Sequence, residues 1–169
     1  MTPDIKILKR RTRLFLLLFM IGLLLSGLTA FPLKTEVIIL QKVVGQGTSI
    51  GSWFPGLSHW ISTVHSGIIQ TDKEFPFLFY GTDWLAFAHI LIAIAFIGPL
   101  LDPVRNIWVI IFGMIACILV IPLAMICGPI RGIPFFWRLI DSSFGIVGIV
   151  PLYFARRYTK RMIEIEKSR

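Results

Sequence analysis

Five ionisable side chains lie in or beside strongly apolar stretches of the sequence, where charge is costly. They are Asp83, His89, Arg131, Arg138 and Asp141. Inside a membrane such groups pair with one another or line a polar site, so each one needs a physical reason. Together they form a candidate polar ligand site for a lipophilic or anionic ligand, a haem or a quinone. The weaker members of this candidate site are His65 and Ser142.

Arg138 and Asp141 are three residues apart, which places them on adjacent turns of one helix face. One interpretation is an ion pair that neutralises both charges at the membrane boundary. Another is that Arg138 extends to the lipid headgroups while Asp141 caps a neighbouring turn. The functional interpretation is a contact to an anion or a substrate. We favour the two structural interpretations, because pairing is the usual fate of such charges.

His89 has one structural interpretation and one functional interpretation. As a neutral imidazole it would hydrogen-bond a neighbouring helix, with Ser142 or Ser143 as its partner. As a functional group it would ligate a haem or a metal, or transfer protons. A bis-histidine haem would need His59 or His65 as the second ligand, because no other apolar stretch contains a histidine. We therefore assign no cofactor to this protein, and we keep haem as a cofactor that His89 could ligate.

The usual signatures of enzymes and metal sites give no support for catalysis. The motifs G-x-G-x-x-G, G-x-x-x-x-G-K-[ST] and H-E-x-x-H are absent. Cys117 and Cys127 would be about 15 Å apart along a helix, whereas a disulfide needs Cα atoms within about 7 Å. His59 and His65 are six residues apart, which is not the i, i+4 spacing of helical zinc sites. We predict no catalytic residue and no metal site.

Composition identifies the class of protein. Apolar residues make up 56% of the 169 residues and charged residues 15%, against about 45–50% and roughly 25% in soluble proteins. The 14 Phe and 5 Trp exclude a disordered chain. What remains is an integral membrane protein of one compact unit.

Four apolar runs are long enough to cross a bilayer. The predicted transmembrane spans are residues 14–31, 84–101, 107–130 and 139–155. The connections at 102–106 and 131–138 are very short, so the last three spans are sequential antiparallel neighbours. We predict an all-α integral membrane fold, a four-transmembrane-helix antiparallel bundle.

The first span follows a basic segment, as in a signal peptide. A cleavage site would have to be residues 28–30, where Leu28 is large and a small residue is needed. We therefore predict that residues 14–31 are an uncleaved signal anchor.

Residues 32–83 form an outward, interfacial segment between the first two spans. Residues 45–56 are rich in Gly and Ser and predict irregular structure, whereas residues 57–70 predict an amphipathic helix. Trp53 and Trp60 suit the membrane interface, where an apolar ring and a polar edge are both satisfied. At the end of this segment we expect Asp83 to cap the second span.

Basic residues predict the orientation. The net charge is +8, and the tails at 1–13 and 156–169 hold five and six of the 17 Lys and Arg. This is the positive-inside pattern, which places both tails in the cytoplasm and attracts anionic lipid. Nucleic acid is not expected as a partner, because the tails offer only Tyr158 as an aromatic residue that could stack on bases.

Three sequence stretches resemble one group of proteins. They are YGTDWLAFAH at 80–89, GPLLDPVRNIW at 98–108 and GPIRGIPFFWRLIDSSFG at 128–145. Within residues 80–156 the chain resembles a group of small bacterial four-span inner-membrane proteins without an assigned activity. The resemblance implies a bacterial cytoplasmic (inner) membrane location, but no substrate, cofactor or catalytic residue.

Two functions from different classes remain. The first is a non-enzymatic accessory, assembly or scaffold protein of the cytoplasmic membrane, with lipids and a membrane-protein partner or a second copy of the chain as its partners. The alternative is the outward-facing Asp/His/Arg ligand site described above.

Overall fold

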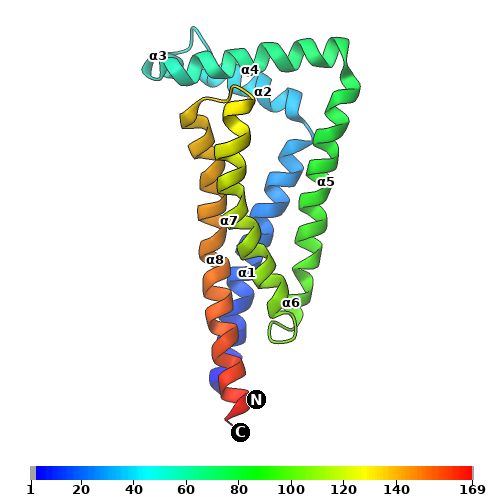
Figure 1. Cartoon of the computed structure of the whole chain (residues 1–169), viewed down its shortest axis with the longest axis vertical. Helices are drawn as coiled ribbons and strands as arrows, with labels where there is room; N and C mark the ends of the chain where they lie inside the picture. Colours follow the sequence, from blue (N-terminus) through cyan, green and yellow to red (C-terminus); the bar gives the residue numbers. More distant parts are fainter. Residues whose placement is uncertain (1–2, 169) are drawn as a thin grey trace. The chain divides into compact units, whose positions relative to one another are not determined.

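The computed structural model describes residues 3–168, and within them the fold is all-α, with no strand. Figure 1 shows the long helices α1 (Pro3–Ala30), α5 (Tyr80–Ala95), α7 (Ile107–Ile130) and α8 (Phe135–Lys167). Four helices are long and apolar enough to cross a membrane, the second being the combined stretch Pro76–Leu101. The predicted class, a four-span helical bundle, is therefore confirmed.

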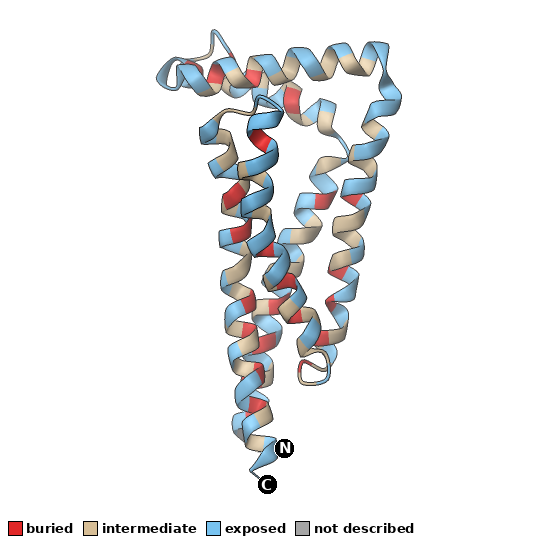
Figure 2. Cartoon of the chain, viewed as in Figure 1, coloured by how far each residue is buried: buried red, intermediate tan, exposed pale blue. Residues whose placement is uncertain are grey.

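The helices divide into two compact units, so the single unit that the chain length predicts is wrong. The terminal unit contains the chain up to Leu23 and the chain from Ile92 onward. The middle unit runs from Leu24 to Leu91. Figure 2 shows that buried positions are scattered along the helices and that much of the ribbon is exposed, as expected for helices whose outer faces meet lipid.

The core of the terminal unit takes side chains from all four spans. Its fully buried members include Leu16 of α1, Phe96 after α5, Ile110 of α7 and Leu152 of α8. Phe19 extends this core, with its ring centroid 4.8 Å from that of Phe96. Because lipid tails are as apolar as these side chains, close packing rather than hydrophobic burial holds such a core together.

Glycines allow the helices of this unit to approach closely. A Cβ at Gly113 of α7 would lie 2.6 Å from the Phe96 ring and 2.9 Å from Leu152. A Cβ at Gly145 of α8 would overlap the carbonyl oxygen of Cys117. Small residues at these positions therefore set the distance between neighbouring helices.

Both basic tails are helical and pack together. Helix α1 starts at Pro3 and α8 continues to Lys167, so neither helix ends where its apolar run ends. Ile5, Leu8 and Met162 form a second buried cluster between them, and Figure 1 shows these two helix ends side by side. Lys and Arg are good helix formers. The predicted tails are thus continuations of the first and last spans.

The second span is interrupted near its end. Helix α5 stops at Ala95, and after Phe96 the chain continues as α6 (Ile97–Leu101). In the following turn the Asn106 amide nitrogen donates to the carbonyl oxygens of Gly98 and Asp102, at 3.2 and 2.9 Å. The Arg13 Nε of α1 donates to the Leu100 carbonyl at 2.9 Å. A cation near the carbonyl end of a helix satisfies acceptors that have no partner within the helix.

The middle unit contains a helical hairpin in the predicted interfacial segment. Helices α2 (Leu33–Val44) and α4 (Pro55–Glu74) pack against each other, with the short α3 (Ser49–Trp53) between them. Lys34 and Asp72 form an ion pair across the hairpin. A 3₁₀ turn, η1 (Pro76–Phe79), leads into α5.

A hydrogen-bond network fixes the closed end of the hairpin. The Ser62 hydroxyl donates to the Gln41 side-chain oxygen at 3.1 Å and accepts the Gln46 amide at 3.2 Å. The Gln46 side chain lies 3.4 Å from the His59 Nδ1. Polar side chains therefore join α2, the loop and α4 where a purely apolar contact would leave the loop amide unpaired.

The boundaries of this segment differ from the prediction in three places. The predicted helix at 57–70 is the longer α4, because Pro55 fits the first turn of a helix. Part of the predicted irregular stretch 45–56 is α3, whose N-cap Thr48 accepts the Gly51 amide at 3.0 Å. Asp83 is not a cap, because α5 already begins at Tyr80 and Asp83 lies in its first turn.

Candidate functional site

The candidate residues of the terminal unit lie around the turn between α7 and α8. Arg131 is exposed and ends α7, whereas Arg138, Asp141 and Ser142 lie in the first two turns of α8. The Ser142 hydroxyl donates to the Arg138 carbonyl at 2.8 Å. This bond within one helix satisfies the buried hydroxyl.

Arg138 packs against α7 and forms no ion pair with Asp141. Its aliphatic stem covers Gly128, where an added Cβ would overlap it, and its guanidinium carbon lies 5.2 Å from the centre of the Phe135 ring. Within residues 3–168 the one ion pair at 4.0 Å or less is Lys34–Asp72. The predicted ion pair between Arg138 and Asp141 is therefore wrong. The aliphatic part of Arg138 packs over Gly128 of α7, where there is no side chain. The Nε of Arg138 is buried and makes no hydrogen bond in the described chain.

His89 is half-buried on α5 and bonds within its own helix. Its Nδ1 lies 2.8 Å from the Leu85 carbonyl. A carbonyl oxygen only accepts, so Nδ1 carries the proton in this contact and Nε2 keeps its lone pair or a second proton. Ser142 and Ser143 instead donate to carbonyls of α8. Each of these polar side chains therefore has a hydrogen-bond partner within its own helix.

His89 also lies where α1 and α5 approach closely. A Cβ at Gly27 of α1 would lie 2.9 Å from the Ala86 carbonyl oxygen and 3.0 Å from the His89 Cβ. Gly27 is therefore the small residue that lets these two helices meet in the middle unit.

Asp83 borders a shallow hollow with aromatic walls. The hollow has a volume of about 230 Å³ and is lined by Phe31, Tyr80, Asp83, Trp84 and Phe87. The ring centroids of Tyr80 and Trp84, and of Trp84 and Phe87, are each 6.0 Å apart in edge-to-face contacts. The spacing 80, 84, 87 places these rings on one helix face, a signal that the sequence contains and that our prediction did not use.

The remaining candidate residue, His65, is not part of a metal-binding cluster in the part of the chain that the structure describes. His65 is half-buried on α4, and no group of three or more His, Cys, Asp or Glu in residues 3–168 could hold a metal ion. Residues 47–51, GTSIG, match the G-x-S-x-G pattern of a nucleophile elbow. That elbow joins a strand to a helix, whereas here a loop after α2 leads into α3. The match therefore lacks the geometry that exposes a catalytic serine.

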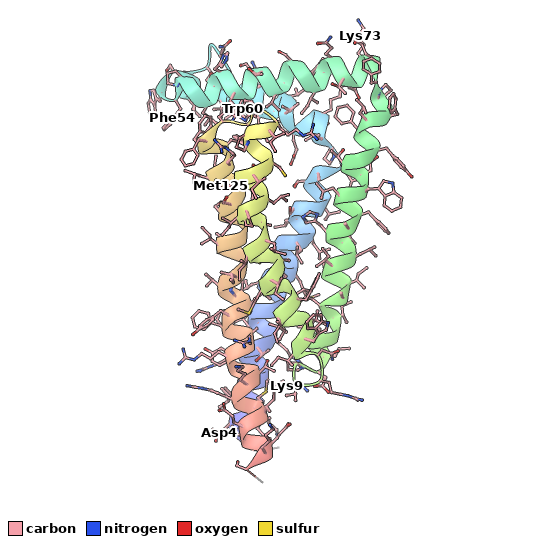
Figure 3. All side chains as sticks on the ribbon, in the orientation of Figure 1. Asp4, Lys9, Phe54, Trp60, Lys73 and Met125 are labelled. Atoms are coloured by element: carbon pink, nitrogen blue, oxygen red, sulfur yellow. The ribbon has the colours of Figure 1, made fainter. Side chains whose placement is uncertain are left out.

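A second hollow lies on the N-terminal part of α1, which the predicted site did not include. It has a volume of about 670 Å³ and is open, with basic and leucine side chains on its walls. Figure 3 shows Lys9, one of the lining residues, extending from α1 near the end where this helix begins. The sequence signal for this hollow is the helical spacing of the basic residues before the first apolar run.

The candidate residues thus fall into two groups. Asp83, His89 and His65 belong to the middle unit, and Arg131, Arg138, Asp141 and Ser142 belong to the terminal unit. Comparisons of the chain with protein-family models, with curated proteins and with solved structures find no match. The fold defines the class on its own: four helices that can span a bilayer make this a multi-pass α-helical membrane protein.

Proposed function

We propose that this protein is a non-enzymatic accessory, assembly or scaffold protein of the bacterial cytoplasmic membrane. In this role it associates with a membrane-protein partner or with a second copy of itself. Its basic termini face the cytoplasm and the α2–α4 hairpin faces outward, in accordance with the charge distribution along the sequence.

The observation that carries this proposal is how the polar side chains of the spans are used. His89 contacts the Leu85 carbonyl, Ser142 donates to the Arg138 carbonyl, and Arg13 donates to the Leu100 carbonyl. Groups that bond to the backbone of their own unit stabilise the fold and are less free to bind a substrate. A site built for chemistry would leave several of them converging on one cavity.

The exposed aromatic side chains of the middle unit add support. Trp53 is 79% exposed, Phe77 70% and Tyr80 63%. Aromatic rings are enriched both at membrane interfaces and at the centres of protein interfaces, because they combine a large apolar area with few rotatable bonds. Figure 3 shows Phe54 and Lys73 toward opposite ends of α4, so the hairpin presents both aromatic and charged ends.

One observation favours the alternative function, an outward ligand site. With its Nδ1 proton held by a carbonyl, His89 has the arrangement that orients histidine ligands of metals and haem. Asp83 lies near aromatic walls that would accommodate a lipophilic ligand. In this alternative the protein binds a haem, a quinone or another lipophilic or anionic molecule.

Native mass spectrometry of the protein released from its own membranes in a mild detergent tests both functions. The proposed role predicts a complex with a second protein, or a dimer, at a fixed stoichiometry. A retained haem, quinone or other small molecule on a single chain would contradict it and support the ligand site. A bare monomer would contradict the proposal of stable association as well.

Two substitutions sharpen this experiment. His89→Ala and Asp141→Ala remove candidate site residues, and we expect both variants to keep the partner protein while the apparent stability falls. Loss of the partner in a variant that still inserts and folds would show that the polar side chain acts in binding. Trp53→Ala is the matched test of an exposed aromatic residue, and we expect it to weaken the complex without lowering stability.

A further inference from the structure

The N-terminal helix carries one continuous stripe of basic and then apolar residues. Its members are Lys6, Lys9, Arg10, Arg13, Leu14 and Leu17. Their spacing of i, i+3, i+4, i+7, i+8 and i+11 puts them on a single helix face. The opposite face, which includes Ile5, Leu8, Thr12 and Leu16, is buried in the terminal unit. The stripe is therefore largely exposed, with Lys9 half-buried and Arg13 bonded to the Leu100 carbonyl, while other residues of the helix are packed in the unit.

The stripe borders the open hollow of about 670 Å³ on α1. Leu14 and Leu17 are 56% and 43% exposed at its apolar end. Lys6 and Arg10 are exposed at its basic end. Ile7 and Arg11 complete the lining, so the hollow is mostly basic toward the start of α1 and apolar toward Leu17.

No acidic side chain neutralises the basic end. Within the described residues, none of Lys6, Lys9 and Arg10 has a carboxylate within 4.0 Å. Arg13 is held by its bond to the Leu100 carbonyl, which fixes part of its guanidinium. Uncompensated cations next to exposed leucines favour an anion that carries its own apolar chain.

We propose that this stripe binds one anionic phospholipid, with the headgroup phosphate on Lys6, Lys9 and Arg10 and an acyl chain along Leu14 and Leu17. The distance from Lys6 to Arg13 is about 10 Å along the helix, comparable with the headgroup layer of roughly 5–8 Å on each side of a bilayer. The leaflet depends on the proposed orientation and is the cytoplasmic one, where anionic lipid attracts juxtamembrane Lys and Arg. The lipid site itself is independent of the accessory role.

The last turns of α8 provide a matched control. Arg157, Lys160 and Arg161 are exposed and have the spacing i, i+3, i+4 of Lys6, Lys9 and Arg10. Replacing either set by glutamine removes three positive charges from one end of the same unit. The α8 residues do not line the α1 hollow. A difference in lipid binding between the two variants is therefore due to the hollow on α1 and not to the total charge.

The test is lipid binding to the full-length protein in detergent, measured by native mass spectrometry during titration with phosphatidylglycerol. We expect one tightly held lipid per chain. Lys6→Gln/Lys9→Gln/Arg10→Gln should weaken its binding at least about tenfold, since each basic residue contributes several-fold near an anionic lipid. Arg157→Gln/Lys160→Gln/Arg161→Gln should weaken it less than about twofold.

Two further probes separate the sources of this binding. Phosphatidylcholine has a phosphate but no net charge, and we expect it to bind at least about tenfold more weakly. Inorganic phosphate lacks the acyl chain and should not displace phosphatidylglycerol. Leu14→Ser/Leu17→Ser keeps all charges and should also weaken lipid binding.

Three results would overturn the proposal. Equal weakening by the two charge variants would show attraction to the total charge and no defined site. Unchanged binding in the α1 variant would place the lipid elsewhere. Displacement of phosphatidylglycerol by inorganic phosphate would show an ion site without an acyl subsite. Thermal unfolding confirms that the variants fold; if the α1 triple variant does not, Arg10→Gln against Arg157→Gln gives the same comparison.

Discussion

The carbonyl oxygen of Cys117 on α7 occupies the space that a Cβ at Gly145 on α8 would need. We therefore expect Gly145→Ala to lower the free energy of unfolding by about 1–3 kcal/mol, because the added methyl group must push two helix backbones apart. The measurement is thermal or chemical unfolding of the purified protein in detergent.

Gly22→Ala is the control for this substitution. A Cβ at Gly22 of α1 meets nothing within 4 Å. Alanine has the higher helix propensity, so this variant should keep or raise stability, by up to about 1 kcal/mol. An equal loss of stability in both variants would contradict the close approach of α7 and α8 at Gly145.

Arg138 shows what sequence spacing alone does not determine. The separation of three residues predicts that Arg138 and Asp141 share a helix face, and both do lie in the first two turns of α8. Whether Arg138 pairs with Asp141 depends on a third residue, Gly128 of α7. Because Gly128 has no side chain, the aliphatic part of Arg138 packs there instead. That space arises only when α7 and α8 are packed, so no pattern within 135–145 predicts it.

Among the elements, the α2–α4 hairpin has the Ser62 hydroxyl at the centre of the hydrogen bonds at its closed end. Ser62 accepts the Gln46 amide at 3.2 Å and donates to Gln41 at 3.1 Å. We expect Ser62→Ala to speed hydrogen exchange of the Gln46 amide by roughly fivefold, which corresponds to a loss of about 1 kcal/mol for one hydrogen bond. Hydrogen exchange with mass-spectrometric detection measures this rate.

Ser66→Ala is the matched control on the same helix. The Ser66 hydroxyl donates to the Ser62 carbonyl within α4, and within the described residues it makes no hydrogen bond across the hairpin. Its removal should leave the exchange rate of the Gln46 amide unchanged. Faster exchange of that amide in both variants would mean that the bridge at Ser62 does not hold the loop.

Helix boundaries were predictable from the sequence where local turn residues begin or end the helix. The third span was predicted at 107–130 and α7 is Ile107–Ile130: a tight turn precedes it, and Gly132, with φ of +70°, follows its last turn. Helices α1 and α8 extend beyond the predicted first and last spans. Hydropathy marks where the apolar run ends, whereas the helix continues for as long as good helix formers and a packing partner continue.

At the scale of the whole molecule, the packing of the basic end of α1 against the basic end of α8 can be tested directly. Met162 is 2% exposed in the cluster with Ile5 and Leu8. We expect Met162→Ala to cost about 2–5 kcal/mol, because it leaves a cavity between the two helices. Trypsin should then cleave faster after the arginines of residues 156–161.

Ile7→Ala is the control for this effect, since Ile7 is 52% exposed on the same end of α1. Limited proteolysis of the two variants in the same detergent gives the comparison. Similar cleavage rates in the two variants would contradict a packed pair of helix ends.

The sequence predicted the class of fold well and the candidate site only in part. Composition and run length identified four spans, because a bilayer imposes its thickness on every helix that crosses it. The hairpin, the two units and the hollow on α1 were not predicted. They depend on contacts between residues far apart in the chain, such as Lys34 with Asp72 and Arg13 with Leu100.

A cysteine-accessibility map tests the four-span topology most directly. In a chain with Cys117→Ala and Cys127→Ser, single cysteines replace Ser52, Arg105, Arg131 or Ser168, and a membrane-impermeant maleimide is added to intact cells. The proposed topology predicts labelling at positions 52 and 131 in intact cells, and at 105 and 168 only after the membrane is opened. Labelling of positions 131 and 168 from the same side would contradict four spans with both ends in the cytoplasm.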